Sequence, residues 1–229
     1  MMVSRRGQLQ SSNQTEAQGI SRCTHSNLEG IIMNQSWDYF KNRLLESPNT
    51  VQIHEKPNSS DAAESTVLET IANNVSLILV NKYLRILGTG DSPYESVHGF
   101  IEEFQKVFHE QRYIVAHDAF GGLFASEYTV FYFSPDNLHW EDLGINYEGF
   151  INWIVDKDIG DFYESFLWPE SDDLLSQVAS DQGVFVYPFF WTKEYNANMA
   201  SRKIVPYREL LEINSQNRSL LDNLHEGET

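Results

Sequence analysis

The chain has 229 residues but only one cysteine, few basic residues and no long apolar run. Its lone cysteine, Cys23, excludes an intrachain disulfide and is typical of proteins of the reducing cytosol, where we expect this one to reside. Because no stretch of about eighteen apolar residues is present, the sequence predicts no membrane-spanning helix. The basic start of the chain is not followed by an apolar segment, so it does not read as a secretory signal.

Positive charge is scarce, with 16 Lys and Arg against 33 Asp and Glu and a formal net charge of −17. Residues 1–32 carry a net +1, which leaves −18 on the rest of the chain. Between Ser134 and Gly183 there are twelve acidic residues and one base, Lys157. Such a surface repels phosphate backbones and anionic membranes, so we expect neither nucleic acid nor membrane as a partner. It either keeps the protein soluble or attracts a basic protein.

Recognisable catalytic and metal-binding motifs are also missing. The sequence has no Gly-x-Ser-x-Gly element, and none of its seven histidines falls in an HExxH pattern. The loop Gly88–Gly90 lacks the lysine of a phosphate-binding loop and is followed by Asp91, which favours a structural turn. The sequence therefore predicts no catalytic residue, no cofactor and no metal ion.

What the chain does have is aromatic residues, at 13% of the total, and they concentrate in Val130–Trp153. This stretch predicts a strand, a Ser-Pro-Asp-Asn turn, a second strand, a short loop and an amphipathic helix. At 41% hydrophobic residues the chain can bury a large core. We expect the hairpin and the helix to pack together through large side chains, namely Tyr132, Trp140, Tyr147, Phe150 and Trp153.

The remaining pattern mixes hairpins with helices and has no βαβ series. Ser36 is a candidate N-cap for a first helix, Asp61 with Glu64 resembles a capping box, and Asn81-Lys82 predicts a tight hairpin turn. Val184–Phe189 reads as a strand buried on both faces, and Pro206 as the first residue of a last helix. The fold class is therefore predicted to be α+β, with a mainly antiparallel sheet of hairpins flanked by helices. We expect a flexible tail at 1–32, one domain at 33–217 and a polar C-terminal tail at 218–229.

Asp118 is the best local candidate for a site. It follows His117 at the end of a predicted strand and precedes two glycines, Gly121 and Gly122. A carboxylate beside flexible glycines is where binding or loop chemistry often occurs. The alternative is structural: Asp118 caps a turn, and both glycines adopt positive φ.

A second group of candidates follows the acidic stretch. Asp136, Trp140, Glu141 and Trp168 would form a binding surface for a basic partner. Further on, the aromatic run Tyr187–Trp191 could be a recognition patch or a core strand, with Trp191 the residue expected to stay partly exposed.

Several blocks together resemble a bacterial family catalogued as domain of unknown function 2625. The match spans about Glu64–Leu211 and leaves out residues 1–35. The matching blocks are Tyr83–Gly90 (YLRILGTG), Asp118–Ala125 (DAFGGLFA), Val130–Trp153, Gly160–Pro169 (GDFYESFLWP), Tyr187–Glu194 (YPFFWTKE) and Ser201–Pro206 (SRKIVP). A more remote similarity is to the fold of the SUKH group of bacterial toxin-immunity proteins, carried by Phe120–Ala125 and Tyr147–Trp153. Neither resemblance implies an activity, although the second is consistent with an acidic inhibitor.

Three functions follow as hypotheses. The first, which we favour, is a non-enzymatic, cytosolic protein-interaction domain, such as an immunity-like inhibitor of a basic toxin. The second is a hydrolase of an unfamiliar type using Asp118 and His117, which requires a pocket where the two side chains converge. The third is a carrier of a small ligand, which requires an apolar pocket touching tryptophan side chains.

Overall fold

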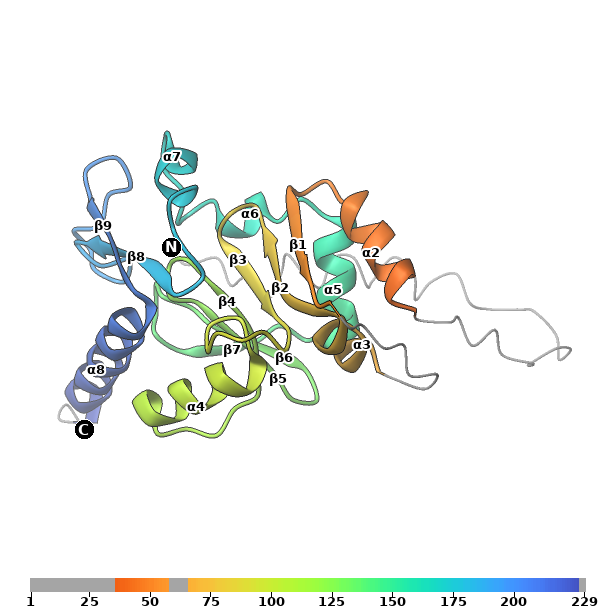
Figure 1. The fold of residues 1–229 in the computed structure, drawn as a ribbon. Helices are drawn as coiled ribbons and strands as arrows, with labels where there is room; N and C mark the ends of the chain where they lie inside the picture. Colours follow the sequence, from red (N-terminus) through yellow and green to blue (C-terminus); the bar gives the residue numbers. More distant parts are fainter. Residues whose placement is uncertain (1–35, 58–65, 227–229) are drawn as a thin grey trace, which may run out of the picture.

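A seven-stranded antiparallel sheet organises the protein (Figure 1). The computed structural model describes residues 36–57 and 66–226. Strand order in the sheet follows chain order, so each strand pairs with its neighbours in sequence. The strands are β1 (Val51–Glu55), β2 (Val75–Val80), β3 (Leu84–Leu87), β4 (Ile114–Asp118), β5 (Leu123–Ser126), β6 (Val130–Phe133) and β7 (Trp140–Asp142). This arrangement confirms the predicted α+β class with a sheet of hairpins.

Helices cover both faces of this sheet (Figure 1). On one side α4 and α8 pack against the strands, and their buried side chains form one core cluster with the sheet. On the other side α2, α3 and α5 contribute to a larger cluster that also includes residues of α6 and α7. The helices are α2 (Trp37–Leu45), α3 (Val67–Asn74), α4 (Val97–Phe108), α5 (Tyr147–Asp156), α6 (Gly160–Tyr163), α7 (Ser171–Leu175) and α8 (Tyr207–Glu226).

A second, two-stranded sheet stands beside α8 (Figure 1). Its strands β8 (Gln182–Tyr187) and β9 (Ser201–Pro206) are antiparallel. The backbone amide of Val184 donates to the carbonyl of Ala119 at 2.6 Å, which ties this hairpin to the chain just after β4. The β8–β9 hairpin is therefore held directly beside the turn that contains Asp118.

Local sequence signals account for several of these boundaries. The Ser36 side chain accepts the backbone N–H of Tyr39 and caps α2, as predicted. Asn81 and Lys82 adopt φ of 48° and 66°, the left-handed geometry of a tight hairpin turn. The capping box predicted at 61–64 lies outside the described residues, and α3 is capped instead by a box of Thr66 and Glu69.

The structure corrects two element predictions and shows that part of the predicted C-terminal tail is helical. Residues 218–226, expected as part of a polar tail, continue α8, because the helix runs on from the domain to Glu226. The tail predicted at 1–32 lies outside the described residues. Pro206 ends β9 and α8 begins one residue later. The strand at 184–189 is not buried on both faces, since Phe185 is half-buried and Tyr187 is exposed.

Trp140 also departs from expectation. Tyr147 and Phe150 of α5 belong to the larger core cluster together with Tyr132. Trp140 instead packs with Phe133 and the residues of the α4 and α8 side. Alternation along the strands explains the difference, because neighbouring positions point to opposite faces of a sheet.

Candidate functional site

Asp118 lies at the end of β4, and its side chain is fully buried. Each of its two carboxylate oxygens accepts two hydrogen bonds. Its Oδ1 accepts the backbone N–H groups of Phe120 at 2.9 Å and Gly122 at 2.8 Å. Its Oδ2 accepts the hydroxyl groups of Tyr132 at 3.1 Å and Tyr163 at 3.2 Å. The carboxylate therefore closes the β4–β5 turn and joins it to β6 and α6.

The two glycines after Asp118 serve this turn in different ways. Gly121 has φ of 94°, which favours glycine, whereas Gly122 does not adopt a positive φ, contrary to expectation. A Cβ on Gly122 would lie 2.2 Å from Asp118 Oδ2 and 2.6 Å from the Tyr132 hydroxyl. Gly122 is thus required for the close approach of the carboxylate, and Gly121 for the direction of the backbone.

Burial dominates the electrostatics of Asp118. Desolvation raises the pKa of Asp118 above its ordinary value, although its four hydrogen bonds act in the opposite direction. Burial also raises the pKa of Tyr163 well above its usual range, and the neighbouring Asp118 adds to this shift. The Tyr163 hydroxyl therefore stays protonated and donates to the carboxylate.

His117 lies on the opposite face of β4. Its Nε2 is 3.3 Å from the carbonyl oxygen of Tyr94, so this nitrogen is the donor of a neutral imidazole. The ring stacks on Phe100 at 4.6 Å and contacts Tyr207 at 4.3 Å. The rings around His117 belong to the cluster on the α4 and α8 side, whereas the tyrosines that bond Asp118 belong to the larger cluster, so the two side chains do not meet at one reacting point.

Arg85, which no sequence pattern singles out, is the cross-strand neighbour of His117 and is also fully buried. Its Nη2 donates to the carbonyl of Ala179 at 3.1 Å. Among the described residues neither Arg85 Nη1 nor His117 Nδ1 has a partner. Burial, and then the nearby Arg85, hold the pKa of His117 well below 6.5.

This buried imidazole makes stability pH-dependent. His117 is neutral in the fold but protonates in the unfolded chain below about pH 6.5, so its contribution is complete above that pH and is lost as the pH falls. Going from about pH 7.5 to about pH 5, we expect His117 to account for up to about 2 kcal/mol of lost stability. Urea unfolding at the two pH values measures this loss.

The matched variant is His117→Gln, which keeps a donor for Tyr94 but does not titrate. It should show a smaller loss of stability on acidification, by the same amount. The raised pKa of Asp118 acts in the opposite direction in both proteins and cancels in the comparison. An identical pH profile for the two proteins would exclude this role for His117.

Asp136, Trp140 and Glu141 lie together at the β6–β7 turn and are half-buried. Asp136 Oδ1 accepts the Ser134 hydroxyl at 2.6 Å, and Glu141 Oε1 accepts the Asn137 side-chain amide. The Arg112 guanidinium lies 4.4 Å from the centre of the Trp140 ring, and Trp140 Nε1 donates to Glu110 at 3.1 Å. These groups are engaged with neighbours from the same region of the fold.

Trp168 is far from these residues along the chain, in the connection between α6 and α7, and it too is half-buried. The Arg202 guanidinium from β9 lies 4.1 Å from its ring centre. The predicted site residues therefore occupy three places: the buried Asp118 turn, the β6–β7 turn and the α6–α7 connection.

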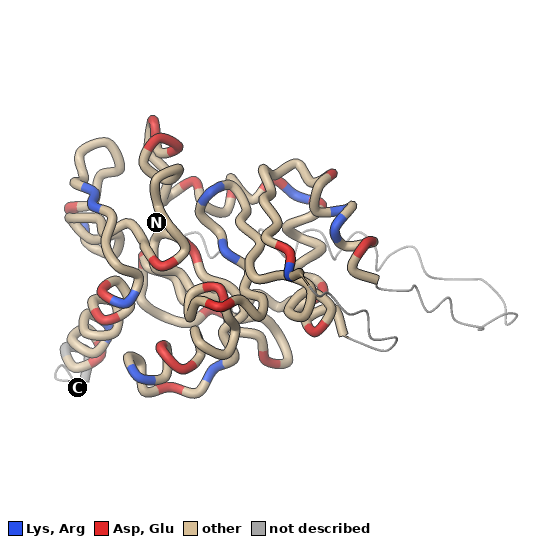
Figure 2. The backbone as a smooth tube through the Cα atoms, in the orientation of Figure 1, with Lys and Arg blue, Asp and Glu red and all other residues tan. Residues whose placement is uncertain are grey.

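The acidic stretch of the sequence becomes an exposed surface from the end of α5 to α7, which we call the acidic segment (residues 156–173). Its only base is Lys157. Ion pairs join Asp156 to Arg43 at 2.8 Å and Asp172 to Lys82 at 3.3 Å. Figure 2 shows acidic positions along this part of the backbone, including the tip at α7. Seven exposed acids make up the segment: Asp156, Asp158, Asp161, Glu164, Glu170, Asp172 and Asp173.

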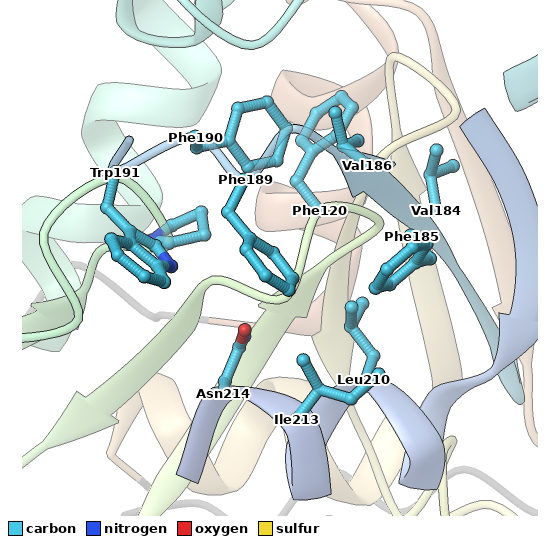
Figure 3. A pocket seen from close by; sticks show the side chains of 11 residues that line it. Phe120, Val184, Phe185, Val186, Phe189, Phe190, Trp191, Leu210, Ile213 and Asn214 are labelled. Atoms are coloured by element: carbon cyan, nitrogen blue, oxygen red, sulfur yellow. The ribbon is translucent and has the colours of Figure 1, made fainter. Parts of the chain in front are cut away.

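Two of the grooves on the described part of the chain lie against α8. The first, which we call the hairpin groove, has an accessible volume of about 10 Å³ and lies between the β8–β9 hairpin and α8 (Figure 3). The second lies between α4 and α8 and is wider and more polar, with Lys106, Arg208 and Glu212 in its walls. Asp118 and His117 line neither of the two.

In the ranges 36–57 and 66–226 no three His, Cys, Asp or Glu side chains gather as ligands for a metal ion. Within the same ranges no helix combines the length and apolar character needed to cross a bilayer.

Comparisons with known proteins identify relatives but no activity. The family described as "Protein of unknown function DUF2625" matches residues 34–210. A putative uncharacterized protein YbfG of Escherichia coli (strain K12) is 27% identical over 205 residues, covering 80% of this chain and 92% of the relative. An uncharacterized protein of Haemophilus influenzae is 31% identical over 119 residues, covering 46% of this chain and 51% of that protein. No solved structure was found to match.

Proposed function

Because this chain belongs to the DUF2625 family of proteins of unknown function, we propose a function from its own surface: it is a protein-interaction domain that binds a basic partner. The observation that carries the proposal is the acidic segment, where seven exposed acids and one base lie within eighteen residues. A field of this sign speeds the encounter with a positively charged protein and discriminates against acidic ones. With a single cysteine the chain suits the reducing cytosol, where we place it.

The geometry of the other candidates is less favourable. A hydrolase using Asp118 and His117 needs both side chains at one pocket, yet they lie on opposite faces of β4 and line neither groove. One observation supports the hypothesis of a small-ligand carrier, because Trp191 lines the hairpin groove. Its accessible volume of about 10 Å³ nevertheless holds no more than one water molecule, far below the range of about 300–1,000 Å³ of typical ligand pockets.

More specifically, we propose that the protein is an inhibitor of a basic toxin. The remote similarity to the SUKH group of immunity proteins supports this form, as does the negative surface. Many enzymes that act on nucleic acids bind phosphate through basic patches, and an acidic domain that covers such a patch blocks the substrate by competition.

The test measures binding to a short, fluorescent peptide of alternating lysine and glycine. Neutralising three acids of the segment (Asp161→Asn, Glu164→Gln and Asp173→Asn) should weaken binding about ten-fold at low salt, because each lost charge removes part of the attraction. Raising the salt from about 50 mM to about 300 mM should weaken binding of the native protein in the same direction.

A control variant changes the net charge equally at exposed acids on α4, at the β5–β6 turn and on α8: Glu102→Gln, Glu127→Gln and Asp222→Asn. Its affinity should stay within about two-fold of the native value, since screening limits the reach of a distant charge to about 10 Å. Equal losses for both variants would show that only the net charge matters, and the proposal would then fail.

A further inference from the structure

Arg85 on β3 places a positive charge in the protein interior. It is only 1% exposed, and none of the ion pairs between described residues includes it. Burial lowers the pKa of its guanidinium, and the opposing influence of Tyr207, Asp118 and Asp181 is smaller. Because a buried cation without a carboxylate partner is unfavourable, the position of this residue requires an explanation.

Arg85 and its cross-strand neighbour His117 each leave one buried polar atom unpaired among the described residues, Nη1 of Arg85 and Nδ1 of His117. Side chains directly opposite each other on two strands lie on the same face of the sheet. The two atoms have complementary roles. Arg85 Nη1 can only donate, whereas His117 Nδ1 accepts, because the other ring nitrogen donates to Tyr94. One hydroxyl group between them would accept from the guanidinium and donate to the imidazole.

The guanidinium lies directly beneath a surface turn. The carbonyl that accepts its Nη2 at 3.1 Å belongs to Ala179, which is exposed, and we call residues 179–181 the covering turn. The Ser180 hydroxyl fastens this turn to the opposite loop by donating to Glu95 at 3.0 Å. The Ala179 carbonyl also accepts the backbone N–H of Gln182 at 3.0 Å, so it keeps a partner when the turn moves away from the guanidinium.

We propose that Arg85 and His117 form a covered binding site for a small hydroxy acid such as glycolate, which enters when the covering turn moves aside. The planar guanidinium presents its N–H groups side by side and matches two ligand oxygens. The ligand carboxylate takes the place of the Ala179 carbonyl at Nη2, and its hydroxyl group bridges Arg85 Nη1 and His117 Nδ1. The site is closed in this structure, so the free energy of opening lowers the apparent affinity. It uses no residue of the acidic segment and does not rest on the proposed function.

Glycolate and acetate test the site, because acetate has the same carboxylate but no hydroxyl group. Each is added to the full chain at about pH 7.5, where His117 is neutral, with sodium chloride keeping the ionic strength constant. The NMR signals of the His117 ring report binding. Glycolate should bind about ten-fold more tightly than acetate, the gain expected from the hydrogen bonds of its hydroxyl group. Equal affinities, or ring signals that glycolate does not move, would overturn the site.

Three variants test the parts of the site. Arg85→Met keeps a long side chain but removes the charge and the donors, so glycolate should lose its advantage over acetate. Ser180→Ala leaves the interior intact and breaks the bond to Glu95, so it should strengthen glycolate binding about five-fold by easing the opening. Ser176→Ala, which removes an exposed hydroxyl bound to the Asp173 carbonyl, is the control and should bind like the native protein. A retained preference for glycolate in Arg85→Met, or no gain in Ser180→Ala, would contradict the proposal.

Discussion

Asp118→Ala is expected to lower the free energy of unfolding by about 3–5 kcal/mol. The substitution leaves four buried donors without their acceptor: the backbone N–H groups of Phe120 and Gly122 and the hydroxyl groups of Tyr132 and Tyr163. It also leaves empty the space beside Gly122 that the carboxylate fills. Since domains are stable by only about 5–15 kcal/mol, this variant should unfold at a much lower urea concentration.

Two further variants locate the cause of this loss. Asp118→Asn keeps an oxygen for the two backbone amides, so it should cost less, about 1–2 kcal/mol. Tyr163→Phe removes one of the four donors and leaves the turn otherwise intact, at a cost of about 1 kcal/mol. If Asp118→Ala were within about 1 kcal/mol of the native protein, the carboxylate would not be the structural centre of the turn.

The second large effect is expected at Gly88. A Cβ at this position would lie 1.9 Å from the carbonyl oxygen of Val75 and 2.6 Å from its carbonyl carbon. These are backbone atoms at the start of β2, and they are fixed because Thr89 donates its N–H to the same oxygen at 3.0 Å. We therefore expect Gly88→Ala to lower the free energy of unfolding by about 3 kcal/mol or more. Urea unfolding followed by circular dichroism measures the difference.

Gly160→Ala is the matched control, because the Cβ there meets only the exposed side chain of Asp158 at 3.0 Å. It should change stability by less than about 1 kcal/mol, since that side chain can move away. A mild effect of Gly88→Ala would mean that the loop at 88–90 can shift. In that case close packing would not be the reason for the glycine.

Local chemistry explains which elements could be predicted from the sequence. Ser36 accepts an N–H three residues away, and the turn at Asn81-Lys82 depends on two residues in a left-handed conformation. Both features depend only on residues that are close together in the chain, so they can be recognised in the sequence. The 218–226 stretch shows the limit, because its polar composition resembles a tail while α8 continues through it.

Elements that depend on distant partners were not predictable. The strand β9 contains Arg202, Lys203 and Pro206, which do not look like a strand on their own. It forms because each of its residues pairs with β8, for example Lys203 with Phe185. Strand pairing across a long loop leaves little trace in the sequence of either strand.

In the candidate site, too, the features set by nearby residues could be predicted and those set by distant residues could not. That Asp118 caps its own turn was a prediction from the glycines that follow it, and the backbone bonds confirm it. Its bonds to Tyr132 and Tyr163, 14 and 45 residues away, were not visible in the pattern. Burial of Arg85 opposite His117 also follows from strand register, which a single sequence does not fix.

The most direct test of the central claim is to map where a basic ligand binds on the full chain. Hydrogen–deuterium exchange with the lysine–glycine peptide, at about 50 mM salt, reports this segment by segment. Protection should increase in the acidic segment, residues 156–173, and should be lost at about 300 mM salt. Protection confined to other parts of the chain, or unchanged by salt, would contradict the account.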